Sequence, residues 1–342
     1  MAALETLGRP GPARVALIGE CMIELSHVAS DRLAVGYAGD VLNTAAYLAR
    51  SAAPGRVDAQ FVTITGDDPY SDRMRASWAA HGVGAALTRV RTGGQAGLYL
   101  IRTDDHGERT FHYYRSQSAA RGLFGPEHGA GIDAAVAASD LVHLSGITLS
   151  ILGDAARERL LDVLDETRRR GGLVSFDGNY RPAGWPSPAA AARAMSAVLA
   201  RTDIALPTLA DDRAVFGDAT AADTARRLRA AGVAEIVIKL GARGCVIASP
   251  DGADDPGPDG PGAGGLVEVP AVPGVRVVDT TAAGDAFNGG YLAARLGGAR
   301  PRGAAEAAAC LAARVIGHRG ALLPPGDRLS ATPAVVPATR EG

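Results

Sequence analysis

The chain is short of lysine, cysteine and net charge. Lys239 is the single lysine among 35 lysine and arginine residues, and the formal net charge at pH 7 is -2. So balanced a chain has no global basic field to hold nucleic acid or an anionic membrane surface. Its three cysteines, Cys21, Cys245 and Cys310, are too few and too scattered for a disulfide framework or a cysteine metal site. We expect reduced, buried thiols and a small-molecule partner, with no nucleic acid and no membrane bound.

Targeting signals and several well-known binding motifs are also missing. No apolar run approaches the roughly 20 residues that cross a bilayer, and residues 1–12 lack the pattern of a signal peptide. We therefore expect a cytoplasmic protein. There is no P-loop GxxxxGK[ST], and the seven histidines lack metal-ligand spacing. The run GPGAGG at 260–265 formally fits a dinucleotide fingerprint, but it follows a proline-rich loop and opens no helix.

The chain does contain a repeated pattern of a short apolar run, a polar or glycine turn and an alanine-rich helical stretch. The expected strands are 15–19, 60–65, 141–145, 173–177, 204–206 and 236–239. The expected helices are 42–53, 69–81, 155–170, 189–200, 221–231, 286–296 and 302–317. This alternation predicts an α/β fold with a doubly wound, mostly parallel sheet and helices on both faces.

Two segments, 24–39 and 94–115, break this pattern, because they alternate apolar and polar residues without helices. The turn at 104–107, Asp-Asp-His-Gly, has hairpin chemistry. We expect a small β-sheet lid inserted into the α/β core, which closes over substrate and excludes water. Residues 250–265 are expected to form a mobile loop, and 1–12 and 324–342 flexible termini, around one α/β domain at 13–323.

The segment VVDTTAAGDAFNGGYL predicts an anion site, because an apolar strand runs through small residues directly into a helix. The backbone amides of Ala282, Ala283 and Gly284 can face a phosphate at the positive end of that helix. Asp285 follows at once, and a carboxylate beside a bound polyphosphate can accept the proton of an attacking hydroxyl. Taken alone, however, Asp285 fits a structural role at the helix dipole better than a catalytic one.

Lys239 has two interpretations. Every other basic residue of the lysine and arginine class is arginine, so Lys239 is expected at a position where a compact ammonium works better than a planar guanidinium. The alternative is that this lysine survives by chance. Its aliphatic stem can also simply pack at a strand end.

Several motifs, in order along the chain, carry a family resemblance. DTTAAGD at 279–285 resembles the DTxGAGD signature of the ribokinase-like (PfkB) carbohydrate kinases. Further segments resemble the 2-keto-3-deoxygluconate kinase branch of that family: GECMIEL, AGDVLNTAAYLAR, GLYLIRTDDHGERTFHYYR, LSGITLSIL and DGNYRP. The similarity covers residues 13–323. Ala282 stands where the general family has glycine, although this branch commonly has alanine there. The chain departs from the branch at Ala38, where glycine is usual, and at Gly178, where asparagine is usual.

The resemblance implies a ribokinase-like fold that binds ATP and Mg²⁺, with Asp285 as catalytic base beside the amides of Ala282, Ala283 and Gly284. The implied substrate-binding residues are Gly39, Asp40, Asn43, Tyr99, Tyr113, Arg115, Ile147, Arg181 and Asp285. The implied nucleotide-binding residues are Lys239, Gly241, Gly244, Thr208, Ala283 and Gly284. The segment 208–211 aligns with the family's NxxE element, so Asp211 is implied to hold Mg²⁺ through water, with Asp212 as a rival.

The resemblance implies ATP-dependent phosphorylation of 2-keto-3-deoxy-D-gluconate to its 6-phosphate. Arginines suit a sugar acid, since a guanidinium meets a carboxylate with two charge-assisted hydrogen bonds. Ordinary surface pairing of Arg115 and Arg181 is the alternative, and Tyr99 and Tyr113 could equally form the core of the lid. The rival functions are a kinase of a neutral sugar such as fructose and a non-catalytic sugar-acid sensor. Exposed edge strands of the lid predict a homo-oligomer. The sequence leaves two questions open: whether a monovalent cation is required near residues 318–321, and which stereochemistry the substrate has at C4.

Overall fold

The computed structural model describes residues 11–29, 31–103, 109–248, 265–326 and 329. The hairpin turn expected at 104–107 lies outside these described residues. So do most of the residues expected to form the flexible termini and the mobile loop at 250–265. Within the described part of the chain, no helix is both long enough and apolar enough to span a membrane.

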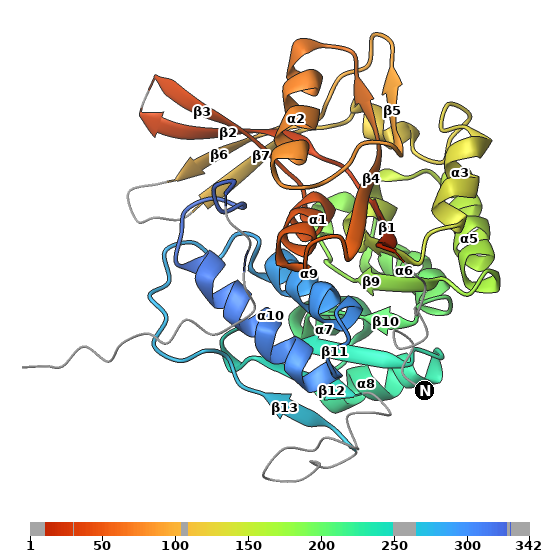
Figure 1. The fold of residues 1–342 in the computed structure, drawn as a ribbon, viewed down its shortest axis with the longest axis vertical. Helices are drawn as coiled ribbons and strands as arrows, with labels where there is room; N and C mark the ends of the chain where they lie inside the picture. The colour runs from red at the N-terminus through yellow and green to blue at the C-terminus, as the bar shows by residue number, and fades with distance from the viewer. Residues whose placement is uncertain (1–10, 30, 104–108, 249–264, 327–328, 330–342) are drawn as a thin grey trace, which may run out of the picture.

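A nine-stranded sheet forms the centre of the molecule (Figure 1), in the order β13-β12-β11-β10-β9-β8-β1-β4-β5. Its strands are β1 (Ala13–Ile18), β4 (Val57–Gly66), β5 (Thr88–Arg91), β8 (Leu141–Ser145), β9 (Leu173–Asp177), β10 (Ile204–Ala205), β11 (Glu235–Lys239), β12 (Cys245–Ala248) and β13 (Val267–Val269). Neighbouring strands from β11 to β5 are parallel, whereas β12 and β13 are antiparallel additions at one edge. The predicted doubly wound, mostly parallel sheet is confirmed.

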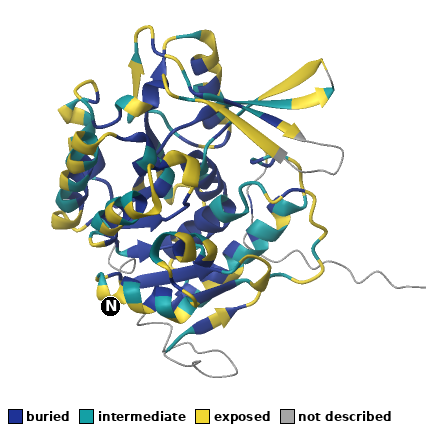
Figure 2. Ribbon diagram, turned by 180° about the vertical axis from the view of Figure 1, so that it is seen from behind, coloured by how far each residue is buried: buried dark blue, intermediate teal, exposed yellow. Residues whose placement is uncertain are grey.

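Helices cover both faces of this sheet because successive side chains of a strand point to opposite faces. Ala16 and Ile18 of β1 pack into the core beneath one set of helices, and Val15 and Leu17 into the core beneath the other. The first set comprises α3 (Ala130–Ala137), α4 (Gly146–Ile151), α5 (Asp154–Arg169), α6 (Pro188–Leu199), α7 (Leu209–Phe216) and α8 (Ala221–Ala230). The second set comprises α1 (Asp40–Ser51), α2 (Pro69–Ala80), α9 (Ala283–Leu296) and α10 (Pro301–Ile316). Figure 2 shows the sheet as the buried interior of this body.

A second, four-stranded sheet projects from one side of the body (Figure 1) and is called the lid sheet below. It contains β2 (Met22–Ala29), β3 (Arg32–Ala38), β6 (Leu98–Thr103) and β7 (Arg109–Tyr114), in the order β3-β2-β6-β7. β2 and β6 are parallel and the other two pairs are antiparallel. Much of its surface is exposed (Figure 2). The predicted small second sheet is confirmed; its closure over a ligand stays a prediction.

The structure contains short elements that the sequence pattern did not predict. They are β5, β12, β13, α3, α4 and α7, with three 3-10 turns, η1 (Ala119–Gly122), η2 (Pro182–Gly184) and η3 (Gly241–Arg243). Two of them, α7 and η1, carry side chains that matter for the site described next.

Candidate active site

The carboxyl ends of the parallel strands meet at one edge of the large sheet, where ligands bind in open α/β folds. Glu20 follows β1, Gly146 follows β8 and Asp177 ends β9. Lys239 ends β11 and lies beside Thr208 through an isolated parallel bridge. The fold therefore brings these polar residues together at one edge of the sheet.

The turn before α9 has the geometry of an anion-binding site. Ala282 caps the helix in a left-handed conformation, with φ 59° and ψ 14°, which costs a non-glycine residue on the order of 1–3 kcal/mol and is typical of functional turns. The amide of Ala283 donates to the carbonyl oxygen of Thr280 at 3.3 Å, so it is not free as the sequence suggested. The amides of Ala282 and Gly284 have no acceptor among the described residues. These two are thus available to a bound anion.

Asp285 lies in the first turn of α9 and is held from α1. The side-chain amide of Asn43 donates from Nδ2 to Asp285 Oδ2 at 2.8 Å, and Thr44 Oγ1 donates to the Asp285 carbonyl oxygen at 3.4 Å. Burial and the nearby Asp40 carboxylate raise the pKa of Asp285 to about 8, against the opposing effects of Asn43 and Lys239. A carboxyl that titrates near neutral pH is well matched to general-base work.

Lys239 forms a buried polar cluster with Asp177 and Asn288. Its Nζ donates to Asp177 Oδ2 at 2.6 Å and to Asn288 Oδ1 at 3.0 Å, and Asn288 Nδ2 donates to Asp177 Oδ2 at 2.6 Å. Although burial works against ionisation, the charge of Lys239 keeps the pKa of Asp177 below its ordinary value. A Cβ placed on Gly284 would lie 3.6 Å from Lys239 Nζ. The cluster therefore joins β9, β11 and α9 beside the turn that begins α9.

Gly39 allows the start of α1 to approach the end of β1. A Cβ at position 39 would lie only 2.1 Å from the carbonyl oxygen of Glu20, so a larger residue cannot keep this packing. Asp40, the next residue, accepts from Asn179 Nδ2 at 2.8 Å. The AGD and DGNYRP motifs are thus in direct contact, and they surround Asp285 together with Asn43.

On the lid sheet, Tyr99 and Tyr113 form a cross-strand pair with ring centroids 5.7 Å apart. Tyr99 is buried and its hydroxyl donates to the Glu24 carboxylate; burial first, and then Glu24, raise the pKa of Tyr99. Tyr113 is 51% exposed. One tyrosine is therefore part of the lid core, whereas the other is open to a ligand.

Arg115 lies where β7 returns to the body, and its Nη2 donates to the carboxylate of Glu20. Glu20 is buried, and its Oε1 has no hydrogen-bond partner in the described structure, nor does Arg115 Nε. Glu20 was not among the predicted site residues. Its position after a strand of the sheet placed it at the edge where ligands bind, but the sequence alone gave it no role there.

The two remaining predicted substrate residues lie at neighbouring strand ends. Ile147 is half-buried in the first turn of α4, beyond a capping box formed by Ser145 and Thr148. Arg181 is exposed and donates from Nη1 to the carbonyl oxygen of Tyr180 at 2.9 Å. Neither is hydrogen-bonded to the Asp285 cluster in the described structure.

A cleft of about 610 Å³ opens between the end of β7, η1, the end of α4 and η2. Tyr113 and Arg115 line it, whereas Asp40, Asn43 and Asp285 do not. The structure therefore separates the predicted residues into a hydrogen-bonded cluster around Asp285 and a cleft beside the lid sheet.

Asp211 and Asp212, the two candidates for Mg²⁺, face different surroundings. Burial and Asp177 raise the pKa of Asp211, while Arg181 and Lys239 oppose that rise, so this carboxyl lies among the charges of the site. Asp212 is buried and accepts from Arg227 Nη2 at 2.6 Å.

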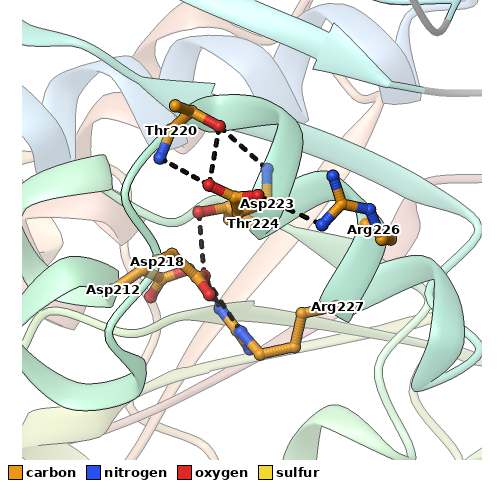
Figure 3. Close-up of polar contacts among 7 residues, drawn as sticks. All are labelled: Asp212, Asp218, Thr220, Asp223, Thr224, Arg226 and Arg227. Carbon is orange, nitrogen blue, oxygen red and sulfur yellow. Dashed lines mark hydrogen bonds and ion pairs between the residues drawn. The ribbon is translucent and has the colours of Figure 1, made fainter.

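Figure 3 shows Arg227 reaching from α8 to Asp212 and also to Asp218. Burial raises the pKa of Asp212 to about 7 despite this pairing. Adjacent side chains on a helix point about 100° apart, so Asp211 and Asp212 cannot face the same surroundings. Asp211 lies among the charges of the site, whereas Asp212 pairs with Arg227.

The predicted nucleotide residues Thr208, Gly241 and Gly244 lie beside Lys239. The Lys239 amide donates to the carbonyl oxygen of Pro207 at 2.8 Å, which joins Thr208 to the end of β11. Gly241 and Gly244 adopt φ of 62° and 90°, in the region that favours glycine, within the tight turn to β12. Among the described residues, no group of three or more His, Cys, Asp or Glu side chains forms a metal site.

The chain matches the pfkB family of carbohydrate kinases over residues 12–326. It therefore belongs to that family, as its motifs predicted. Among its relatives, the 2-dehydro-3-deoxygluconokinase of Dickeya dadantii (strain 3937) is 43% identical over 322 residues, which are 94% of this chain and 98% of the relative.

Solved structures confirm the ribokinase-like fold. The 2-dehydro-3-deoxygluconokinase of Thermotoga maritima superposes with a TM-score of 0.74 at 22% identity, covering 94% of this chain and 96% of that one. A fructokinase with bound ATP from Xylella fastidiosa also gives a TM-score of 0.74, at 23% identity, covering 90% and 93% of the two chains.

Proposed function

We propose that this chain transfers the γ-phosphoryl group of ATP to the 6-hydroxyl of 2-keto-3-deoxy-D-gluconate, which is another name for 2-dehydro-3-deoxygluconate. The Dickeya relative carries the name of that kinase and aligns over nearly its whole length. The observation that carries the proposal is the placement of Asp285. Its carboxyl directly follows an anion-binding turn and is oriented by Asn43.

Asp285 is the general base of the reaction. The acceptor hydroxyl binds at its free carboxylate oxygen and loses its proton to Asp285 as the hydroxyl oxygen attacks the γ-phosphorus. The amides of Ala282 and Gly284 stabilise the negative charge of the phosphoryl group, and the buried Lys239 adds a cation behind the turn. The catalytic contribution of the protein is therefore positioning and charge stabilisation.

ATP binds along the edge formed by Thr208, Lys239, Gly241 and Gly244. Mg²⁺ supplies charge neutralisation to the phosphates when it is bound. Asp211 is the residue that would hold it through water, because its carboxyl oxygens are hard ligands and lie among the charges of the site. Asp212 is not available for this role while Arg227 holds it.

The lid sheet supplies the sugar-acid contacts. Tyr113 and Arg115 face the cleft, and Tyr99 supports Tyr113 from the neighbouring strand. When the lid sheet closes and excludes water, the acceptor is surrounded by these side chains and by Gly39, Asp40, Asn43, Ile147 and Arg181.

We also propose that the chain is cytoplasmic and assembles into a homo-oligomer through the exposed edge strands β3 and β7 of the lid sheet. A single-chain mass in light scattering would contradict the homo-oligomer.

The test is ADP release with Mg²⁺ and ATP, measured against 2-keto-3-deoxygluconate, 2-keto-3-deoxygalactonate, fructose and ribose. We expect a keto-deoxy acid to give the highest kcat/KM, and the two epimers to report the stereochemistry at C4. Turnover of the neutral sugars alone would replace this function with that of a neutral-sugar kinase. Binding of an acid without any turnover would favour the sensor instead.

A further inference from the structure

The cleft beside the lid sheet has the chemistry of a site for a polyhydroxylated acid. Its wall includes the amides of Gln95 and Gln117, the hydroxyls of Ser116 and Ser150, and the phenol of Tyr113. These groups donate and accept hydrogen bonds as sugar hydroxyls do. This inference rests on the proposed function and concerns how the cleft binds the carboxylate of the substrate.

Arg115, the expected partner of that carboxylate, is already paired. Its guanidinium donates to Glu20, which is only 2% exposed and has no other basic partner in the described structure. The two charges cancel, so the pair presents no net positive charge to an incoming anion. A substrate carboxylate placed at Arg115 would also lie near the buried negative charge of Glu20, which disfavours binding.

Arg181 does not supply the positive charge that the Arg115–Glu20 pair lacks within the cleft. It is not part of the cleft wall, and its charge acts on Asp211. One of its guanidinium nitrogens is also bound to the carbonyl oxygen of Tyr180. Both arginines implied by the family resemblance therefore have acidic neighbours.

Arg121 is the guanidinium in the cleft wall that has no acidic partner among the described residues. It belongs to η1, whose neighbouring residues Ala119 and Ala120 are buried against the body. The amide of Ala119 donates to the carbonyl oxygen of Gln95 at 2.8 Å, and that of Arg121 to Ser118 at 3.1 Å. The backbone of Arg121 is thus fixed, while its side chain is exposed.

We propose that Arg121 determines acid specificity by binding the substrate carboxylate next to Arg115. With Arg121, the cleft carries two guanidinium groups and one buried carboxylate, a net charge that matches one substrate carboxylate. The Arg115–Glu20 pair then helps to orient the substrate carboxylate, and Arg121 supplies the positive charge that no carboxylate of the protein balances. A neutral sugar gains nothing from this arrangement, so Arg121 discriminates between the two substrate classes.

The experiment compares wild type with Arg121→Ala and Arg121→Lys in steady-state assays on the keto-deoxy acid and on ATP. We expect Arg121→Ala to raise KM for the acid about 10- to 100-fold, with kcat and KM for ATP nearly unchanged, and Arg121→Lys to recover part of the loss. Arg193→Ala, an exposed arginine on α6 outside the cleft, is the matched control and should behave as wild type.

An unchanged KM for the acid in a folded Arg121→Ala variant would overturn the inference while leaving the proposed function intact. So would an equal rise in KM for ATP, since that would indicate a general disturbance of the fold. Failure of the proposed function has a different signature, because wild type itself would then not phosphorylate a keto-deoxy acid. Direct calorimetric titration of the acid into wild type and into Arg121→Ala separates these outcomes.

Discussion

Asp285→Asn is the perturbation that the structure specifies most fully. The asparagine has the shape of aspartate and can still accept the hydrogen bond from Asn43, but it cannot take up the proton of the acceptor hydroxyl. General-base catalysis contributes about 10²- to 10⁴-fold, so kcat should fall by that factor with KM for ATP little changed. Asp154→Asn is the matched control, because Asp154 also lies in the first turn of a helix but is exposed and belongs neither to the Asp285 cluster nor to the cleft wall.

The pH profile of wild type gives the same reasoning a second readout. With the pKa of Asp285 raised to about 8 by burial and by Asp40, roughly a tenth of the free enzyme carries the ionised base at pH 7 and about a hundredth at pH 6. The profile of kcat/KM reports the free enzyme, so it should rise about tenfold between pH 6 and pH 7 and level off above pH 8. Asp40→Asn should move this limb to lower pH, because it removes a like charge.

As the pH rises, the stability of the folded wild type should fall while its activity rises. The pKa of Asp285 rises from its ordinary value of 3.8 to about 8 on folding, so between these values the unfolded chain is ionised and the folded chain holds a proton. Raising the pH through this window therefore destabilises wild type. Asp285→Asn lacks this penalty and should have a higher Tm, with an advantage that grows from pH 4 to pH 8. A variant with near-normal kcat, or one that loses activity together with Tm, would refute the assignment of Asp285 as a buried base.

The remaining predictions concern Lys239 and the two aspartates of α7. Lys239→Met should lower the free energy of unfolding by about 3–5 kcal/mol, because it leaves the buried carboxylate of Asp177 without its cation; a loss below about 1 kcal/mol in urea denaturation would show that the pair is not a structural support. Asp211→Asn should raise the Mg²⁺ concentration for half-maximal activity about tenfold or more, whereas Asp212→Asn should leave that concentration unchanged and serve as its matched control. Equal effects of the two substitutions in a Mg²⁺ titration would contradict the different roles assigned to them.

The fold could be predicted well from the sequence where apolar runs are long and turns are clear. The expected strands 141–145 and 173–177 coincide with β8 and β9, because both are short buried runs bounded by glycine or aspartate. The short elements were missed for a physical reason. β13 has three residues and α7 has eight, too few for a period of 2 or 3.6 to be recognised.

The candidate site could be predicted residue by residue only where a local motif exists. The DTTAAGD turn is such a motif, because its own sequence predicts an anion site before Asp285. By contrast, the pairing of Glu20 with Arg115 joins residues 95 positions apart. Lys239 and Asp177 are separated by 62 positions. Which of two adjacent aspartates faces the site depends on Arg227 of another helix, and no local pattern contains that information.

The most direct test of the central claim is the identity of the product. Purified wild type, incubated with Mg²⁺, ATP and 2-keto-3-deoxygluconate, should form one phosphorylated product, whose ³¹P resonance couples to the two protons of C6. A phosphate on another carbon, or no transfer to this acid while fructose is phosphorylated, would contradict the account.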